Sequence, residues 1–347
     1  NIQLLTSKIK GSEQVDTRFQ LSQNKIDIVV GTHSLFQEKT TFNNLGLIVI
    51  DEQHKFGVQQ RINLSLKGSV NTDVLLMTAT PIPRTLILTN YGDMDISTIN
   101  EKPFNNTTIN TLAKPAEKMD DVMVFLKKRL DENDQVYWVT PLIEESEKLK
   151  LTPAVKRYEY LKKKLKVEVG LVHGAMKSED KNKIMEDFIS GKIKVIVSTT
   201  VIEVGIDNQN ANTMIIENCE RFGLSQLHQL RGRVGRGKLD AYCLLLYSKN
   251  IGTNGKKRIQ ILKSSLDGFY ISEEDLKLRG FGDIIGYKQS GEKDFIIADP
   301  AYHSDLFQLA KEEIENLENK DVKLEEHFSQ LLKIFKKDRV LNIIDTG

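Results

Sequence analysis

Two adjacent carboxylates, Asp51 and Glu52, directly follow the apolar run LGLIVI at residues 45–50. Such a run is typical of a buried strand, and ligands of open α/β sheets bind beyond the carboxyl ends of the strands. An acidic pair there suits a nucleotide bound with Mg²⁺, because one carboxylate can hold the metal while the other polarises the attacking water. A strand followed by a solvated turn explains the same residues equally well, so other parts of the sequence must decide.

Small polar residues follow two further strand-like runs, MTATPIPRT at 77–85 and VSTTVIEVGID at 197–207. Hydroxyl groups at a strand end can donate to a phosphate or relay hydrogen bonds between two sites, and a glycine permits close backbone approach. Each stretch is also explained by a turn that caps a helix. The candidate residues are Thr78, Thr80, Thr199, Thr200, Gly205 and Asp207.

Arginines and glycines alternate in QLHQLRGRVGRG, residues 226–237, where Arg231, Arg233 and Arg236 are separated by glycines. The guanidinium group forks onto phosphate oxygens and stabilises the charge that develops in phosphoryl transfer. Because such a run rarely serves a core, we predict that it contacts the phosphates of a nucleotide or a nucleic acid.

A helical hairpin is predicted over FYISEEDLKLRGFGDIIGYKQSG, residues 269–291. Ser272 precedes three acidic residues and is expected to cap the first short helix. The sequence RGFGD interrupts that helix, which places Arg279 and Gln289 near the ends of the hairpin. A hairpin with no role beyond packing remains the alternative.

Short apolar runs alternate with helical patterns along the chain. This alternation predicts a scaffold of parallel strands that holds these residues. We expect a mostly parallel sheet covered on both faces, with a first α/β domain over 1–100, a polar linker over 101–110, a second α/β domain over 111–250 and a helical region over 251–347. Strands are predicted at 26–31, 45–50, 73–78, 134–140, 167–172, 193–199, 212–218 and 241–247, and helices at 56–66, 116–130, 154–165 and 179–189.

Composition excludes several classes of protein. The 347 residues carry a net charge of +1, so a polyanion would have to be held by local patches of positive charge. The two cysteines, Cys219 and Cys243, lie in strand-like runs and predict reduced core residues, without a disulfide framework or a zinc site. The apolar runs are too short to span a membrane and no signal peptide is recognisable, so we expect a cytoplasmic protein.

The quoted motifs, in their order and spacing, resemble motifs II, III, V and VI of superfamily 2 helicases: DEQH, TAT, STTVIEVGID and QLHQLRGRVGRG. The stretches MTATPIPRT, YGDMDIS and VHGAMKSEDK, together with the hairpin, narrow the resemblance to the RecG family of ATP-dependent DNA helicases. It covers nearly the whole chain, most firmly residues 45–291. The runner-up is the transcription-repair coupling factor, which shares the hairpin but carries a longer C-terminal domain. The hairpin departs from the family pattern at Phe281 and Lys288, where proline and arginine are favoured.

The resemblance implies two RecA-like parallel-sheet helicase lobes, the first of them incomplete, followed by a C-terminal helical hairpin region. It implies ATP and Mg²⁺ as cofactors and branched DNA, such as forks and Holliday junctions, as the partner of a monomer in recombination and repair. Asp51 and Glu52 would be the metal-binding and water-activating acids, and Arg236 would meet the γ-phosphate. His54, Gly205, Asp207, Gln229 and Arg233 would contact or sense the nucleotide, and Thr78, Thr80, Thr199, Thr200, Arg279 and Gln289 would couple it to DNA.

A phosphate-binding loop of the pattern G-x-x-x-x-G-K-[ST] is missing from the sequence. The nearest match, GRVGRGKL from Gly232, ends in Leu239 and lies inside the arginine run. In the RecG family this loop precedes the acidic pair, as does the wedge domain that grips branched DNA. Since the chain also begins at Asn1 and not at Met, we expect a fragment that is inactive alone. A non-enzymatic nucleic-acid-binding module and an RNA helicase remain alternatives, because the acidic pair and the arginine run do not distinguish DNA from RNA.

Overall fold

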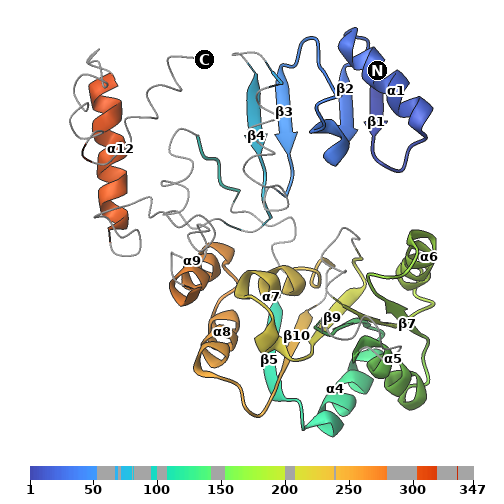
Figure 1. Ribbon diagram of the computed structural model, residues 1–347. Helices are drawn as coiled ribbons and strands as arrows, with labels where there is room; N and C mark the ends of the chain where they lie inside the picture. Colours follow the sequence, from blue (N-terminus) through green and yellow to red (C-terminus); the bar gives the residue numbers. More distant parts are fainter. Residues whose placement is uncertain are drawn as a thin grey trace. The chain divides into compact units, whose positions relative to one another are not determined.

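The computed structural model divides the chain into two units, residues 1–79 and residues 80–347 (Figure 1). The structure describes residues 1–52, 67–68, 72–79, 81, 95–99, 108–141, 153–199, 208–237, 240–279, 303–318 and 334.

The first unit contains two pairs of parallel strands. Strands β1 (Ile2–Leu5) and β2 (Ile28–Gly31) flank helix α1 (Gly11–Ser22) in sequence and pair with each other, and β3 (Leu47–Ile50) pairs with β4 (Asp73–Leu76). A short 3₁₀ helix, η1 (His33–Leu35), follows β2. Phe42 packs against the core clusters of both strand pairs and so joins them. The predicted strands β2, β3 and β4 are confirmed, whereas β1 and α1 were not predicted.

One face of these strands is apolar and exposed. Along β1 to β4 exposed positions alternate with half-buried or buried ones, and the exposed fractions of the outward aliphatic side chains run from 49% at Leu75 to 68% at Ile2. Parallel sheets normally bury both faces under helices. The helix predicted at 56–66, which follows β3 in the sequence, lies outside the residues that the structure describes. The outward residues are Ile2, Leu4, Ile28, Val30, Leu47, Val49 and Leu75.

The second unit is built on a six-stranded parallel sheet with the order β5-β10-β9-β6-β8-β7. Every residue of β6, β8 and β9 is buried, as expected for central strands covered on both faces. The strands are β5 (Ile109–Pro115), β6 (Gln135–Val139), β7 (Val169–Val172), β8 (Val195–Ser198), β9 (Ala211–Ile216) and β10 (Ala241–Tyr247).

Helices cover both faces of this sheet (Figure 1). On one face, α4 (Met119–Asp131) and α5 (Pro153–Lys164) pack over a core that includes Trp138. On the other face, α6 (Ser178–Ile189), α7 (Leu224–Arg231) and α8 (Thr253–Ser264) enclose a second core. A 3₁₀ helix, η5 (Cys219–Arg221), precedes α7, while α9 (Gly268–Arg279) and α12 (Ser304–Glu318) follow α8. In this unit the predicted strands and helices that fall on described residues are confirmed.

Two further expectations can be compared with the structure. Strand β5 begins at Ile109, inside the segment predicted as a linker, and pairs with the last strand, Ile109 opposite Ala241.

Both cysteines are free and buried, as predicted, and burial raises the pKa of each thiol to about 12. Among the described helices, none has the length and apolarity needed to cross a membrane.

Candidate nucleotide and nucleic-acid site

The acidic pair lies at the carboxyl end of β3, as predicted. Asp51 follows the last residue of β3, and Thr78 lies two residues beyond β4. The register sets Ile50 opposite Leu76, and the Met77 amide donates to the Ile50 carbonyl at 2.8 Å. Asp51 and Thr78 therefore lie at the same edge of this sheet.

The backbone turns sharply between the two acids. Glu52 has a φ of 51°, in the left-handed region, and its amide donates to Asp51 Oδ1 at 2.8 Å. Left-handed non-glycine residues are uncommon and gather at functional sites. Asp51 is exposed and Glu52 is half-buried. An accessible carboxylate suits Mg²⁺, which takes one or two carboxylates and completes its shell with water and phosphate oxygens. In the described part of the chain, no cluster of three potential metal ligands occurs.

Buried hydroxyl groups gather at the carboxyl end of β8. Thr199 is 4% exposed, and neither Ser198 Oγ nor Thr199 Oγ1 has a hydrogen-bond partner among the described residues. Buried hydroxyls are ordinarily bonded. Thr199 therefore fits the predicted role of a hydroxyl donor to a ligand.

Helix α7 positions the arginine run. Gln229 lies on α7 and is half-buried, and the chain leaves the helix at Gly232. Gly235 adopts a φ of +76°, and a side chain at Gly237 would come within 2.5 Å of the Gln209 carbonyl oxygen. These glycines therefore serve a turn and a close backbone approach. Arg236 is half-buried and its Nε donates to the Gly232 carbonyl at 3.1 Å.

Arg231 does not share the surroundings of Arg233, which is half-buried in the turn after α7. The Arg231 side chain is 2% exposed and donates to the carbonyl oxygens of Leu262 at 2.5 Å and Ser265 at 2.9 Å. Burial lowers the pKa of its guanidinium group from the usual value. The prediction that Arg231 contacts phosphate is therefore wrong, because its fork is already occupied by backbone carbonyls.

Helix α9 is bonded to α7. It begins at Gly268, where Asp267 Oδ1 accepts from the Phe269 amide at 2.9 Å in the manner of a helix N-cap. The prediction that Ser272 caps this helix is wrong, because Ser272 lies inside it and its Oγ donates to the Pro81 carbonyl at 2.5 Å. Ser225 of α7 donates to Asp275 at 2.8 Å. Arg279 is the last residue of α9, at the helix end where it was predicted.

Several predicted residues lie outside the described part of the chain, as does the second helix of the predicted hairpin. These residues are His54, Thr80, Thr200, Gly205, Asp207 and Gln289.

Comparisons with known proteins extend over nearly the whole chain. Residues 1–88 match the family model described as DEAD/DEAH box helicase, residues 117–238 match the helicase conserved C-terminal domain, and residues 265–343 match ATP-dependent DNA helicase RecG, domain 3, C-terminal. The ATP-dependent DNA helicase RecG of Synechocystis is 44% identical over 97% of this chain. The chain belongs to the RecG family.

The RecG relatives are longer than this chain. It spans 40% of the Synechocystis protein and 43% of the Escherichia coli K12 RecG, to which it is 45% identical over 85% of its length. A solved structure of RecG bound to a three-way DNA junction is 40% identical, with a TM-score of 0.62 over 88% of this chain and 39% of that chain. The yeast protein Dbp5, bound to RNA and ADP–BeF₃, is 15% identical with a TM-score of 0.54 and shares the fold alone. These likenesses confirm the predicted RecA-like helicase lobes.

Sequence reasoning missed an ion pair at the carboxyl end of β9 in this RecG-family lobe. Glu217 accepts from Trp138 Nε1 at 2.9 Å and pairs with Arg157 of α5 at 2.6 Å. The Arg157 guanidinium also lies 5.0 Å from the centre of the Trp138 ring, a cation–π distance. The signal was an acid at the end of an apolar strand, the same signal that marked Asp51.

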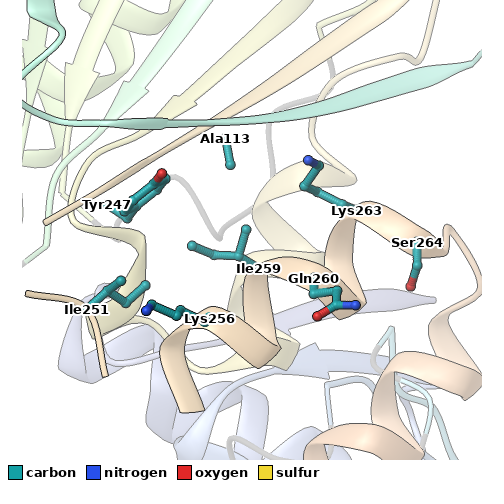
Figure 2. A pocket seen from close by; sticks show the side chains of 8 residues that line it. All are labelled: Ala113, Tyr247, Ile251, Lys256, Ile259, Gln260, Lys263 and Ser264. Carbon is teal, nitrogen blue, oxygen red and sulfur yellow. The ribbon is translucent and has the colours of Figure 1, made fainter. Parts of the chain in front are cut away.

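A cavity of about 500 Å³ lies elsewhere, between α8 and the ends of β5 and β10 (Figure 2). Figure 2 shows Ala113, Tyr247, Ile251 and Ile259 on its apolar wall and Lys256 and Lys263 at its margin. None of the predicted site residues lines this cavity.

Proposed function

We propose that this chain is the motor part of a longer RecG-type protein that uses ATP to remodel branched DNA by fork reversal and junction branch migration. The match of residues 265–343 to a RecG-specific model carries the proposal, since that model separates RecG from helicases that share only the two lobes. The curated relatives are named ATP-dependent DNA helicases, and one solved relative is bound to a three-way DNA junction. The same match favours RecG over the transcription-repair coupling factor and over an RNA helicase.

The nucleotide chemistry in this proposal depends on both lobes. Asp51 would hold the Mg²⁺ of the nucleotide and Glu52 would accept a proton from the attacking water. Mg²⁺, when bound, would neutralise charge on the phosphate oxygens. Arg236 would stabilise the charge that develops on the transferred phosphoryl group, and Gln229 and Arg233 would contact the nucleotide beside it. A phosphate-binding loop, absent from this sequence, would have to come from a segment outside it.

The remaining assignments follow the same proposal. The first lobe would comprise residues 1–100, the linker 101–110, the second lobe 111–250 and the translocation region 251–347. Thr78, Thr199 and Arg279 would pass changes at the nucleotide to the DNA. The protein would act as a monomer in the cytoplasm.

The test uses the full-length gene product, with ATP hydrolysis and strand separation measured on a synthetic fork. Glu52→Gln is expected to bind the fork normally but to lower hydrolysis by about 10²–10⁴-fold, the usual contribution of a proton-accepting side chain. Asp73→Asn is the matched control, because Asp73 is an exposed acid at the amino end of β4, on the same sheet. A wild-type protein without fork-stimulated hydrolysis, or a Glu52→Gln variant with normal turnover, would contradict the proposal.

A further inference from the structure

Arg231 is a buried cation whose bonds go mainly to backbone carbonyl groups. Besides the carbonyl oxygens of Leu262 and Ser265, its guanidinium group lies 3.1 Å from His228 Nδ1 and 3.5 Å from Thr111 Oγ1. Within the described residues, no carboxylate forms an ion pair with it. These partners belong to the end of α8, the turn between α8 and α9, helix α7 and the first strand of the lobe, β5.

Burying the charge of Arg231 at this position is energetically unfavourable. Removing an ion from water costs several kcal/mol, and apolar residues of similar volume often stabilise a core better than buried charges do. What the guanidinium adds is geometry, because its planar fork fixes several acceptors at once. Arg231 therefore defines how α7 sits against the turn that leads into α9.

Two segments next to Arg231, the arginine run and helix α9, belong to the proposed motor. Arg233 and Arg236 lie two and five residues beyond Arg231, which is the last residue of α7. On the other side, α9 contacts α7 closely: a side chain at Gly268 would come within 2.9 Å of His228 Nε2. Through Ser272, α9 also bonds to Pro81.

We propose that Arg231 is a positioning residue that keeps the arginine run in register with the α8–α9 turn, so that a displacement of the run reaches α9. This inference rests on the proposed function. Arg231 itself touches neither nucleotide nor DNA in this proposal, and acts through α7 and the turn.

The test compares Arg231→Lys and Arg231→Met with wild type in the full-length protein. Lysine keeps the charge without the fork, and methionine fills much of the space without donors. Both variants are expected to keep the KM for ATP within about twofold and to lower the number of base pairs separated per ATP by about tenfold, within the range of measured coupling effects. Arg231→Met leaves the carbonyls of Leu262 and Ser265 without their donor and is expected to lower the melting temperature, whereas Arg231→Lys keeps a donor and is expected to lower it less.

Arg129→Lys is the matched control. Arg129 is also buried, but it lies on α4, over the opposite face of the sheet, where it pairs with Glu132 and Asp134. Its variant is expected to keep the wild-type ratio of unwinding to hydrolysis. An unchanged ratio in the Arg231 variants, the same loss in Arg129→Lys, or failure of both Arg231 variants to fold would overturn the inference. Absence of fork-stimulated hydrolysis in the wild type would instead overturn the proposed function.

Discussion

The three arginines of the 226–237 run divide between the core and the surface. Arg231 ends α7 inside the protein, whereas Arg233 and Arg236 follow in a turn that Gly235 makes possible through its positive φ. Alternation with glycine in the sequence gives no sign of this division, because the buried position depends on carbonyls that lie 31 and 34 residues further along the chain.

Arg236 has the proposed role of stabilising the transferred phosphoryl group. In the full-length protein, Arg236→Ala is expected to lower ATP turnover by roughly 10³–10⁵-fold, the contribution of a finger arginine in related phosphoryl transfer, while ATP binding changes little. Steady-state hydrolysis and nucleotide titration on the same preparation measure the two effects. Arg221→Ala, at an exposed position in η5, should retain normal turnover. Near-normal turnover of the Arg236 variant would remove Arg236 from the site.

The placement of Asp51 and Thr78 could be predicted from sequence, because neighbouring parallel strands end at the same edge. The left-handed turn at Glu52 could not, since nothing in the residue type requires a positive φ there. Glu217 and Arg157 are 60 residues apart in the sequence, so a local sequence pattern could not predict that they pair.

At the level of single elements, continuous apolar runs were predictable, and strands that mix polar with apolar residues were not. β1 reads IQLL and β5 reads INTLAKP, each with polar residues among the apolar ones. β5 lies at the edge of the described sheet and is only partly buried, so its sequence lacks the continuous apolar run of β8 or β9. Its polar start therefore predicts a linker when the sequence alone is considered.

The junction of α9 with α7 can be tested by adding a single methyl group. A Cβ at Gly268 would come within 2.8 Å of Pro81 Cγ and 2.9 Å of His228 Nε2. Gly268→Ala is therefore expected to destabilise the protein by about 1–3 kcal/mol, as overpacking does. Chemical denaturation followed by circular dichroism measures the loss.

Gly252→Ala provides the control for this substitution. Gly252 precedes α8, and a Cβ there would meet no atom within 4 Å. The only expected effect comes from the weaker preference of alanine for the N-cap position. Replacing glycine there should lower the stability of the protein by less than about 1 kcal/mol. Equal losses in both variants would show that α9 is not packed against α7 as described.

For the whole molecule, alternation of strands and helices predicted the α/β class and the parallel sheet. It could not predict that the outward aliphatic residues of β1 to β4 are exposed, because a sequence pattern reports which residues are apolar and not what covers them.

The 347-residue chain alone is expected to show no fork-stimulated ATP hydrolysis above background. Its sequence holds no phosphate-binding loop, so Asp51 and Glu52 have no positioned γ-phosphate to act on. A steady-state assay with and without fork DNA tests this, with the full-length protein as the positive control. Turnover by the isolated chain that rises with DNA would show the prediction to be wrong.

The strand order of the second unit has a consequence for biosynthesis. β5 is the first strand of the sheet to leave the ribosome, but its partner β10 follows only after a separation of 132 residues, as between Thr108 and Asp240. At the usual rate of translation, that interval lasts about 7 to 26 s. Because β10 inserts between β5 and β9, both strands present open edges until then, and open edges pair readily with other chains. A ribosome that stalls before Ala241 would therefore display a sheet that lacks β10, with β5 unpaired, to the chaperones and proteases around it.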